Sequence, residues 1–167
     1  MNDDDAGAGA GDLAGFLPYQ LSVASNAVSA LIAERYRKRF GLKIPEWRVM
    51  AVLGDAEALG GSLTQRDLTA ATVMDKVAVN RAVKVLEERG LVARVPNPGD
   101  GRSHLLALTG EGRGIHAEVM PLARATEADL LAGLAADEEA SLRHLLGRLR
   151  ERAMRLASET REGPEQG

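Results

Sequence analysis

Residues 61–109 read GSLTQRDLTAATVMDKVAVNRAVKVLEERGLVARVPNPGDGRSHLLALT, and this stretch decides the fold. Its pattern predicts a short helix, a tight turn, a longer helix and two strands joined by a loop. Gly90 is expected to end the longer helix, and turn-forming residues fill the loop at 96–102. We therefore expect a mainly α-helical fold with a small β wing.

The longer helix, residues 76–89, has two faces of different character. At 3.6 residues per turn, the apolar face consists of Val79, Ala82, Val83 and Leu86. The opposite face consists of Lys76, Val77, Asn80, Arg81 and Lys84. An Asn side chain can pair bidentately with adenine, an Arg with guanine, and an exposed Val can touch a thymine methyl group. We interpret this segment as the recognition helix of a winged helix-turn-helix that binds double-stranded DNA.

Capping residues precede both helices. Thr64 can cap the short helix, and Asp67 stands at the reciprocal position of a capping box. Asp75 can cap the longer helix. Gln65 and Arg66 lie in the exposed first turn of the short helix, where side chains of this kind can hold DNA phosphates.

The charges of the longer helix run against the helix dipole. Lys76 lies at its positive N-terminal end, whereas Glu87 and Glu88 lie at its negative C-terminal end. Stability alone favours the opposite arrangement. The observed one is expected if the N-terminal half enters a DNA groove and the C-terminal half stays outside, with sequence drift as the alternative explanation.

The loop between the two strands carries a candidate minor-groove residue. Arg102 lies near the tip of the loop, and the negative potential of a narrow minor groove attracts Arg. Asp100 is placed to hold Arg102 or to cap the loop backbone, and Ser103 follows directly. The alternative is a plain solvated hairpin.

Long helical patterns flank this stretch on both sides. An apolar stripe runs through residues 13–40, with Pro18 near the expected start of the helix and Gly41 at its end. A further helix begins at residues 44–47, Thr109 can cap the next one, and the last runs from about Asp137. A single helix as long as the first cannot bury its stripe on a small domain alone, so a partner subunit is a reasonable second surface.

Composition excludes several classes of protein. The chain has 167 residues and no cysteine, which excludes disulfides, Cys-ligated zinc and thiol-based redox sensing. The three histidines lie on different predicted elements, so no metal site is expected. A Gly-rich phosphate loop, HExxH and GxSxG are all missing, so we expect neither an enzyme nor a cofactor. The net charge of −3 means that DNA binding has to come from a local basic patch.

The sequence also bears on location. No apolar run approaches the roughly 18 residues that a membrane span needs. The N-terminus, MNDDDAGAGAGD, is acidic and lacks the basic start and apolar core of a signal peptide. We therefore expect a cytoplasmic protein.

The stretch at residues 61–109 resembles the MarR family of bacterial transcriptional regulators. The most specific matches are LEERGLV at 86–92 and DGRS at 100–103 followed by LT at 108–109, and the resemblance covers about 13–156. It implies a homodimer, paired through the first and the last two helices, that binds a palindromic operator and usually represses nearby genes. It also implies a small, often aromatic ligand that binds between the dimer lobe and the DNA lobe and weakens DNA binding.

The resemblance assigns a role to each part of the chain. It implies one MarR-type domain at 13–157, with dimerisation helices at 13–40 and 110–157 and a DNA-binding lobe at 44–108. We expect a disordered acidic tail at 1–12 and a frayed tail at 158–167. The predicted DNA-binding residues are Gln65, Arg66, Lys76, Val77, Asn80, Arg81, Lys84, Asp100, Arg102 and Ser103. In the family's arrangement the residues of the recognition helix line the major groove, Arg102 enters the minor groove and Asp100 orients it.

The candidate ligand-binding residues are Asn26, Trp47 and His116, which come from the helices that would meet at the family's pocket. Each of them also fits a purely structural role. A winged-helix adaptor for protein interactions, without ligand sensing, is the alternative function. The exposed cations of the predicted recognition helix and wing argue against it.

Overall fold

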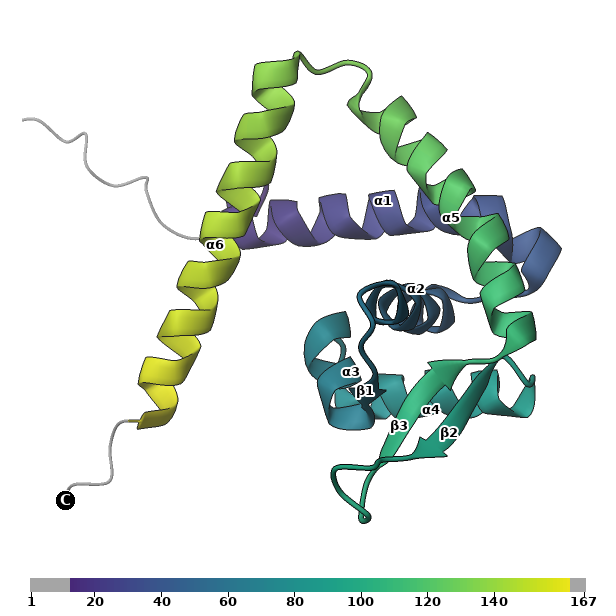
Figure 1. Cartoon of the computed structure of the whole chain (residues 1–167). Coiled ribbons are helices and arrows are strands. Elements are labelled where there is room, and N and C mark those ends of the chain that lie inside the picture. Colours follow the sequence, from purple (N-terminus) through teal and green to yellow (C-terminus); the bar gives the residue numbers. More distant parts are fainter. Residues whose placement is uncertain (1–12, 163–167) are drawn as a thin grey trace, which may run out of the picture. The chain divides into compact units, whose positions relative to one another are not determined.

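The computed structural model describes residues 13–162, whose elements follow the order that the sequence predicts (Figure 1). The helices are α1 (Leu17–Phe40), α2 (Ile44–Ala58), α3 (Gln65–Thr72), α4 (Lys76–Glu88), α5 (Gly110–Leu131) and α6 (Ala136–Glu162). The strands are β1 (Leu63–Thr64), β2 (Val92–Pro96) and β3 (His104–Leu108). The mainly α-helical fold with a small β wing is therefore confirmed. The tail predicted at 1–12 lies outside the described residues.

Two compact units divide the chain, one ending at Arg124 and the other beginning at Ala125. The boundary lies inside α5. In the second unit, α6 continues to Glu162 and thus passes Ser158, where the frayed tail was predicted to begin. Arg143 of α6 pairs there with Glu127 of α5 and with Glu139 one turn earlier, which helps to hold this helical hairpin together.

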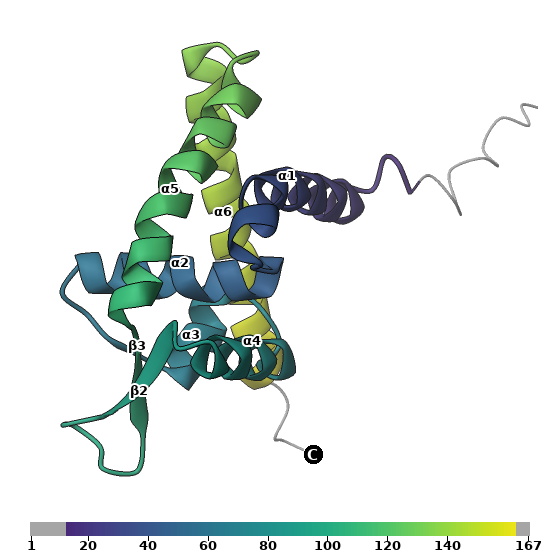
Figure 2. The same ribbon diagram turned by 90° about the vertical axis from the view of Figure 1, so that its right-hand side faces the viewer.

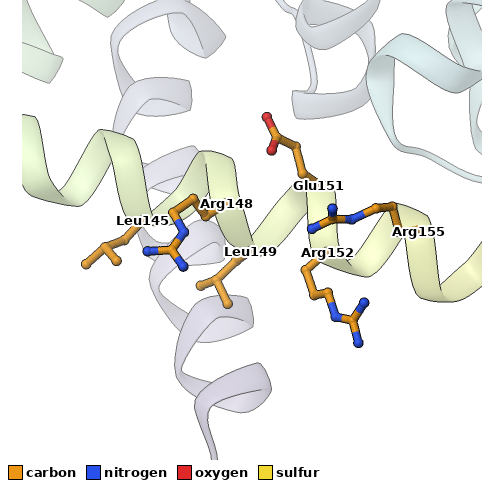
Figure 3. Close-up of a pocket in the computed structure, with 6 residues that line it drawn as sticks. All are labelled: Leu145, Arg148, Leu149, Glu151, Arg152 and Arg155. Carbon is orange, nitrogen blue, oxygen red and sulfur yellow. The ribbon is translucent and has the colours of Figure 1, made fainter.

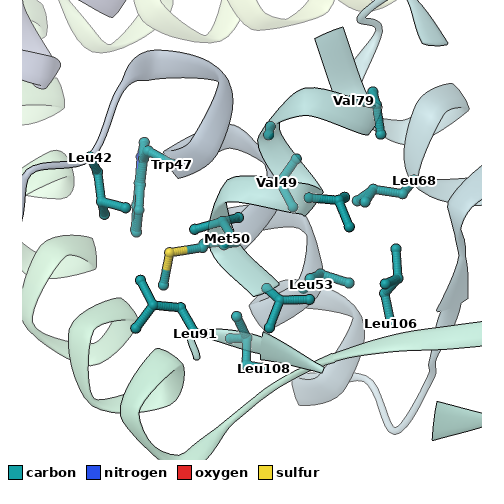
Figure 4. Packing of buried hydrophobic residues seen from close by; sticks show 14 of the residues in the cluster. Leu42, Trp47, Val49, Met50, Leu53, Leu68, Val79, Leu91, Leu106 and Leu108 are labelled. Atoms are coloured by element: carbon teal, nitrogen blue, oxygen red, sulfur yellow. The ribbon is translucent and has the colours of Figure 1, made fainter. Parts of the chain in front are cut away.

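The helix-turn-helix packs around α2. In Figures 1 and 2, α3 and α4 lie against α2, and the β2–β3 hairpin stands beside them. The cluster of buried side chains in Figure 4 joins these elements, with α2 at its centre. The largest fully buried side chains of this core are Tyr36, Leu42, Met50, Leu53, Leu68, Leu86, Leu91 and Leu106. Burial of this apolar surface holds the recognition helix in a fixed place.

The wing is part of a three-stranded antiparallel sheet with the order β1-β3-β2. The predicted hairpin is confirmed, with Val92 opposite Leu108 and Arg94 opposite Leu106. The sequence did not predict β1, which pairs Leu63 with Leu106. A strand of two residues is too short to show an alternating pattern, because its existence depends on a partner far along the chain.

The first and last helices leave apolar side chains exposed. In α1 the buried residues are Ala33 and Tyr36, both in its C-terminal half. The exposed large apolar residues of α1 are Leu17, Tyr19, Leu21, Val23, Val28 and Leu31. Those of α6 are Leu142, Leu145, Leu146, Leu149, Met154 and Leu156. No helix within residues 13–162 is long and apolar enough to cross a membrane.

Candidate DNA-binding surface

Both helices of the helix-turn-helix begin at the predicted caps. The backbone N–H of Asp67 donates to Thr64 Oγ1 at 3.2 Å, and the N–H of Thr64 donates to Asp67 Oδ2 at 3.0 Å, so the capping box is closed. The hydrogen bonds from Thr64 lower the pKa of the Asp67 carboxyl. At the start of α4, Asp75 Oδ1 accepts from the N–H of Ala78 at 2.8 Å. The start of each helix is therefore encoded locally.

The turn between these helices contains a conformation that the sequence does not signal. Val73 adopts a left-handed backbone with φ of 53°, and its side chain is 84% exposed. A left-handed conformation costs roughly 1–2 kcal/mol for an L residue and is least expected at a β-branched one. The tight turn imposes this geometry because α3 and α4 are both anchored in the core on either side of it.

The structure confirms the two faces of α4. The four residues of the predicted apolar face, Val79, Ala82, Val83 and Leu86, are all buried. The five residues of the predicted reading face, Lys76, Val77, Asn80, Arg81 and Lys84, are all exposed. Lys84 lies 3.8 Å from Glu88, one turn further on, in an exposed ion pair. This face therefore presents donors, a methyl-bearing side chain and positive charge to solvent.

Arg89 fixes the C-terminal end of α4. Its guanidinium donates to the carbonyl oxygens of Phe40 at 2.6 Å and Gly41 at 3.2 Å, at the end of α1. It also lies 3.9 Å from the buried carboxylate of Glu46, which accepts from the N–H of Lys43 at 2.8 Å. The end of α1, the start of α2 and the end of α4 are thus tied together by one cation.

A hydrogen-bonded chain that the sequence did not reveal links the reading face to the sheet. Arg94 of β2 donates to both carboxylate oxygens of Glu87, at 2.8 and 3.3 Å, and to Gln65 Oε1 at 3.2 Å. Gln65 Nε2 in turn donates to Asn80 Oδ1. Two predicted DNA-binding residues, Gln65 and Asn80, are therefore brought together. Glu87, which lies at the negative end of the helix dipole, anchors this chain.

In the wing, the structure shows which of its two predicted roles Asp100 takes: holding the Arg102 side chain or capping the loop backbone. Its Oδ1 accepts from the backbone N–H of Arg102 at 3.0 Å, so Asp100 caps the loop backbone. Asn97 Nδ2 donates to Ser103 Oγ at 2.8 Å across the base of the loop. Arg102 itself is exposed. The loop is thus internally bonded, and it presents the guanidinium of Arg102 outwards near its tip. Arg66 is likewise exposed, in the first turn of α3.

Two of the three candidate ligand-binding residues lie together. The rings of Trp47 and His116 stack with centroids 5.6 Å apart, and the centroid of the Tyr36 ring lies 5.6 Å from that of Trp47. Burial lowers the pKa of the His116 imidazole, while Glu57 and Asp55 partly oppose that shift. Asn26 is exposed on α1 and joins neither ring contact.

Gly54 of α2 explains how the His116 ring fits against that helix. A Cβ atom at position 54 would lie 2.3 Å from His116 Nε2, closer than any real contact, so any other residue would displace the ring. The sequence offered no such signal, because it does not show that residues 54 and 116 meet. The aromatic cluster is therefore closely fitted to its surroundings, as a structural role requires.

Known proteins are similar to this chain in sequence and in architecture. The MarR family pattern matches residues 40–103, from the end of α1 to the loop that joins β2 to β3. The chain belongs to the MarR family. It is 28% identical over 136 residues to an HTH-type transcriptional repressor of Mycobacterium tuberculosis, an alignment that covers 81% of this chain and 91% of the relative.

Solved structures agree with this assignment. A probable transcriptional regulator from Pseudomonas aeruginosa is 31% identical, with a TM-score of 0.69 over 82% of this chain and 98% of that one. The PcaV regulator of Streptomyces coelicolor, solved with its natural ligand, is 28% identical, with a TM-score of 0.70 over 87% and 99%. The chain is therefore a winged helix-turn-helix, DNA-binding transcriptional repressor and not an enzyme.

Proposed function

We propose that this repressor acts as a homodimer, binds a palindromic operator through α4 and the wing, and leaves it when a small aromatic ligand binds. The observation that carries the proposal is the exposed face of α4, whose donors and positive charges stand opposite a fully buried apolar face. That arrangement fixes the helix while leaving Asn80 and Arg81 exposed, where they can meet base edges. Specific readout in the major groove requires both properties.

The apolar faces of α1 and α6 support the dimer. Exposed leucines recur along α6 at helical spacing, and apolar patches of this extent usually mark an interface. Part of this helix borders a hollow of about 380 Å³, which is lined by Leu145, Leu149 and four charged side chains, Arg148, Glu151, Arg152 and Arg155 (Figure 3). A second copy of the chain is the proposed cover, because two-fold interfaces are self-complementary.

The positive charges exposed on α4 and the wing support binding to DNA phosphates. Lys76, Arg81 and Lys84 are exposed on α4, and Arg102 is exposed in the wing, although the whole chain is acidic. Cations that neutralise phosphates release counterions, so binding should weaken steeply as the salt concentration rises. In a two-fold dimer, the recognition helices should enter successive major grooves about 10 base pairs apart.

The ligand is proposed to bind beside the stacked rings of Trp47 and His116. Trp47 and His116 form a stacked pair next to Tyr36, so aromatic side chains are gathered where the ligand is proposed to bind. A regulator of similar sequence and fold has been solved with its natural ligand. We keep Asn26, Trp47 and His116 as the proposed contacts.

A mobility-shift series tests the proposal. Operator duplexes are first selected from a random library with the wild-type protein, and the Asn80→Ala and Arg102→Ala variants are then titrated against them. Loss of one bidentate base contact costs about 1–3 kcal/mol, so we expect Asn80→Ala to weaken binding roughly tenfold or more. Arg124→Ala removes an exposed cation from α5 and serves as the control, with no expected effect. Full operator affinity in both variants would show that this surface does not read DNA.

A further inference from the structure

We propose that Arg94 and Glu87 set the hydrogen-bonding polarity of Asn80 through Gln65, and thereby decide which base atoms the recognition helix accepts. These two residues would then be specificity-determining without contacting a base. The inference rests on the proposed role of Asn80 in reading DNA.

The chain of hydrogen bonds crosses three elements. Arg94 lies on β2, Gln65 is the first residue of α3, and Glu87 and Asn80 lie two turns apart on α4. Arg94 donates through Nε and Nη2 to the two oxygens of Glu87, at 2.8 and 3.3 Å. The same Nη2 donates to Gln65 Oε1 at 3.2 Å, and Gln65 Nε2 donates to Asn80 Oδ1.

The chemistry of the groups gives this chain a direction. A guanidinium has only donors, so the atom of Gln65 that faces Arg94 has to be the acceptor Oε1. The amide nitrogen of Gln65 is then turned towards Asn80. Asn80 has to accept this hydrogen bond through Oδ1, so its Nδ2 is turned away from the protein. An Asn amide without such neighbours has no fixed orientation, because its two ends have the same shape.

Glu87 holds the first member of the chain in place. Its carboxylate accepts two bonds from one guanidinium, a bidentate geometry that is stronger and more directional than a single neutral hydrogen bond. The pair is only partly exposed, at 40% for the Arg94 side chain and 29% for that of Glu87. Arg94 therefore cannot swing freely towards a phosphate while Glu87 retains it.

The consequence is a biased reading of bases. Asn80 offers its Nδ2 donors to the groove, while its Oδ1 is held by Gln65. It is thus suited to an acceptor such as the N7 of a purine. The exocyclic amino group of cytosine, which is a donor, is disfavoured. Without the chain, Asn80 could turn over and accept from cytosine, so discrimination at that base pair would fall.

The test compares base preference and not affinity alone. The base pair that Asn80 reads is identified as the one at which Asn80→Ala removes discrimination among the four possible pairs. Arg94→Met, Arg94→Lys and Gln65→Glu are then measured against the same four duplexes. We expect Arg94→Met to lower discrimination at this pair roughly tenfold and to leave other positions unchanged. Arg94→Lys, which keeps a donor, should restore part of it.

Gln65→Glu is the sharper variant because it keeps the shape of the side chain and an acceptor for Arg94. A carboxylate has no donor, so Asn80 must turn Nδ2 inwards and present Oδ1 to the groove. We expect its preference to move towards a base that offers an amino group, such as cytosine. Ala70→Glu adds the same charge to an exposed position of α3 and should weaken all four duplexes equally.

The outcomes separate this inference from the proposed function. Unchanged discrimination in both Arg94→Met and Gln65→Glu, with normal binding by the wild type, overturns the inference alone. The same holds if every variant weakens all duplexes uniformly, which is the mark of a stabilising or phosphate-binding role. A wild-type protein that selects no duplex at all overturns both proposals.

Discussion

The recognition helix α4 and the C-terminal helix α6 are both amphipathic, yet they bury their apolar faces to very different degrees. Leu86 of α4 is 0% exposed and lies in the core shared with α2 and the sheet. Leu146 of α6 is 45% exposed, like its leucine neighbours along that helix. The same sequence pattern thus leads to a closed core in one region and to an open face in the other. The pattern identifies the apolar face but not the surface that covers it.

The difference separates folding from association. Burying a leucine side chain is worth about 1.5–3 kcal/mol. In α4 that free energy belongs to folding of the single chain, because the covering residues are present within it. In α6 it is available to a second molecule, which is why we propose that α6 contributes to a dimer interface.

The largest expected effect comes from opening the closed core. Leu86→Ala should lower the free energy of unfolding by about 2–5 kcal/mol, since truncation of a fully buried leucine loses its transfer free energy and leaves a cavity. Urea unfolding followed by circular dichroism measures this loss. The matched truncation Leu146→Ala should cost much less when measured at a protein concentration at which the chain is monomeric. If the two variants lost equal amounts of unfolding free energy, the apolar face of α6 would be as buried within the single chain as that of α4, and the comparison would be wrong.

The second prediction tests the open face. Leu146→Glu should weaken dimerisation by roughly 100-fold, because a two-fold interface loses the burial of this leucine twice. Sedimentation equilibrium over a range of concentrations gives the dissociation constant. Leu59→Glu places the same change at a residue that is 82% exposed at the end of α2, and it should leave that constant unchanged. If both variants dimerise like the wild type, the apolar face of α6 is not the interface.

The smallest effect concerns His116, at the aromatic cluster. Burial lowers its pKa in the folded protein below the ordinary value of 6.5, so the unfolded chain binds a proton more readily. The stability that the neutral imidazole contributes is therefore present above pH 6.5 and is lost as the pH falls through 6.5 towards the lower folded value. His116→Gln, which does not titrate, should lose less stability than the wild type between pH 7.5 and 5.5 in urea titrations. Parallel declines in the two proteins would rule out the lowered pKa.

Local signals in the sequence account for the features that it predicted well. The caps at Thr64 and Asp75, the two faces of α4 and the β2–β3 hairpin all follow from residues within a few positions of one another. Features that depend on distant residues were missed, such as the β1 strand and the chain from Arg94 to Asn80. The only sequence signal for this chain was weak: Arg94 is an outward-facing residue in a short strand. Val73 gave none, because its backbone conformation is imposed by the packing of the helices on either side.

The predicted DNA-binding residues occupy one lobe of the fold, but their contacts with DNA stay a prediction. Footprinting of wild-type protein and Arg102→Ala on a selected operator tests it most directly. Methylation protection reports guanine N7 in the major groove, and hydroxyl-radical cleavage reports the minor groove. We predict two major-groove protections about 10 base pairs apart, from the paired α4 helices, with minor-groove protections outside them that Arg102→Ala removes. Retained minor-groove protection in Arg102→Ala, or methylation protection without that spacing, would contradict the assignment of α4 and the wing as the DNA-reading surface.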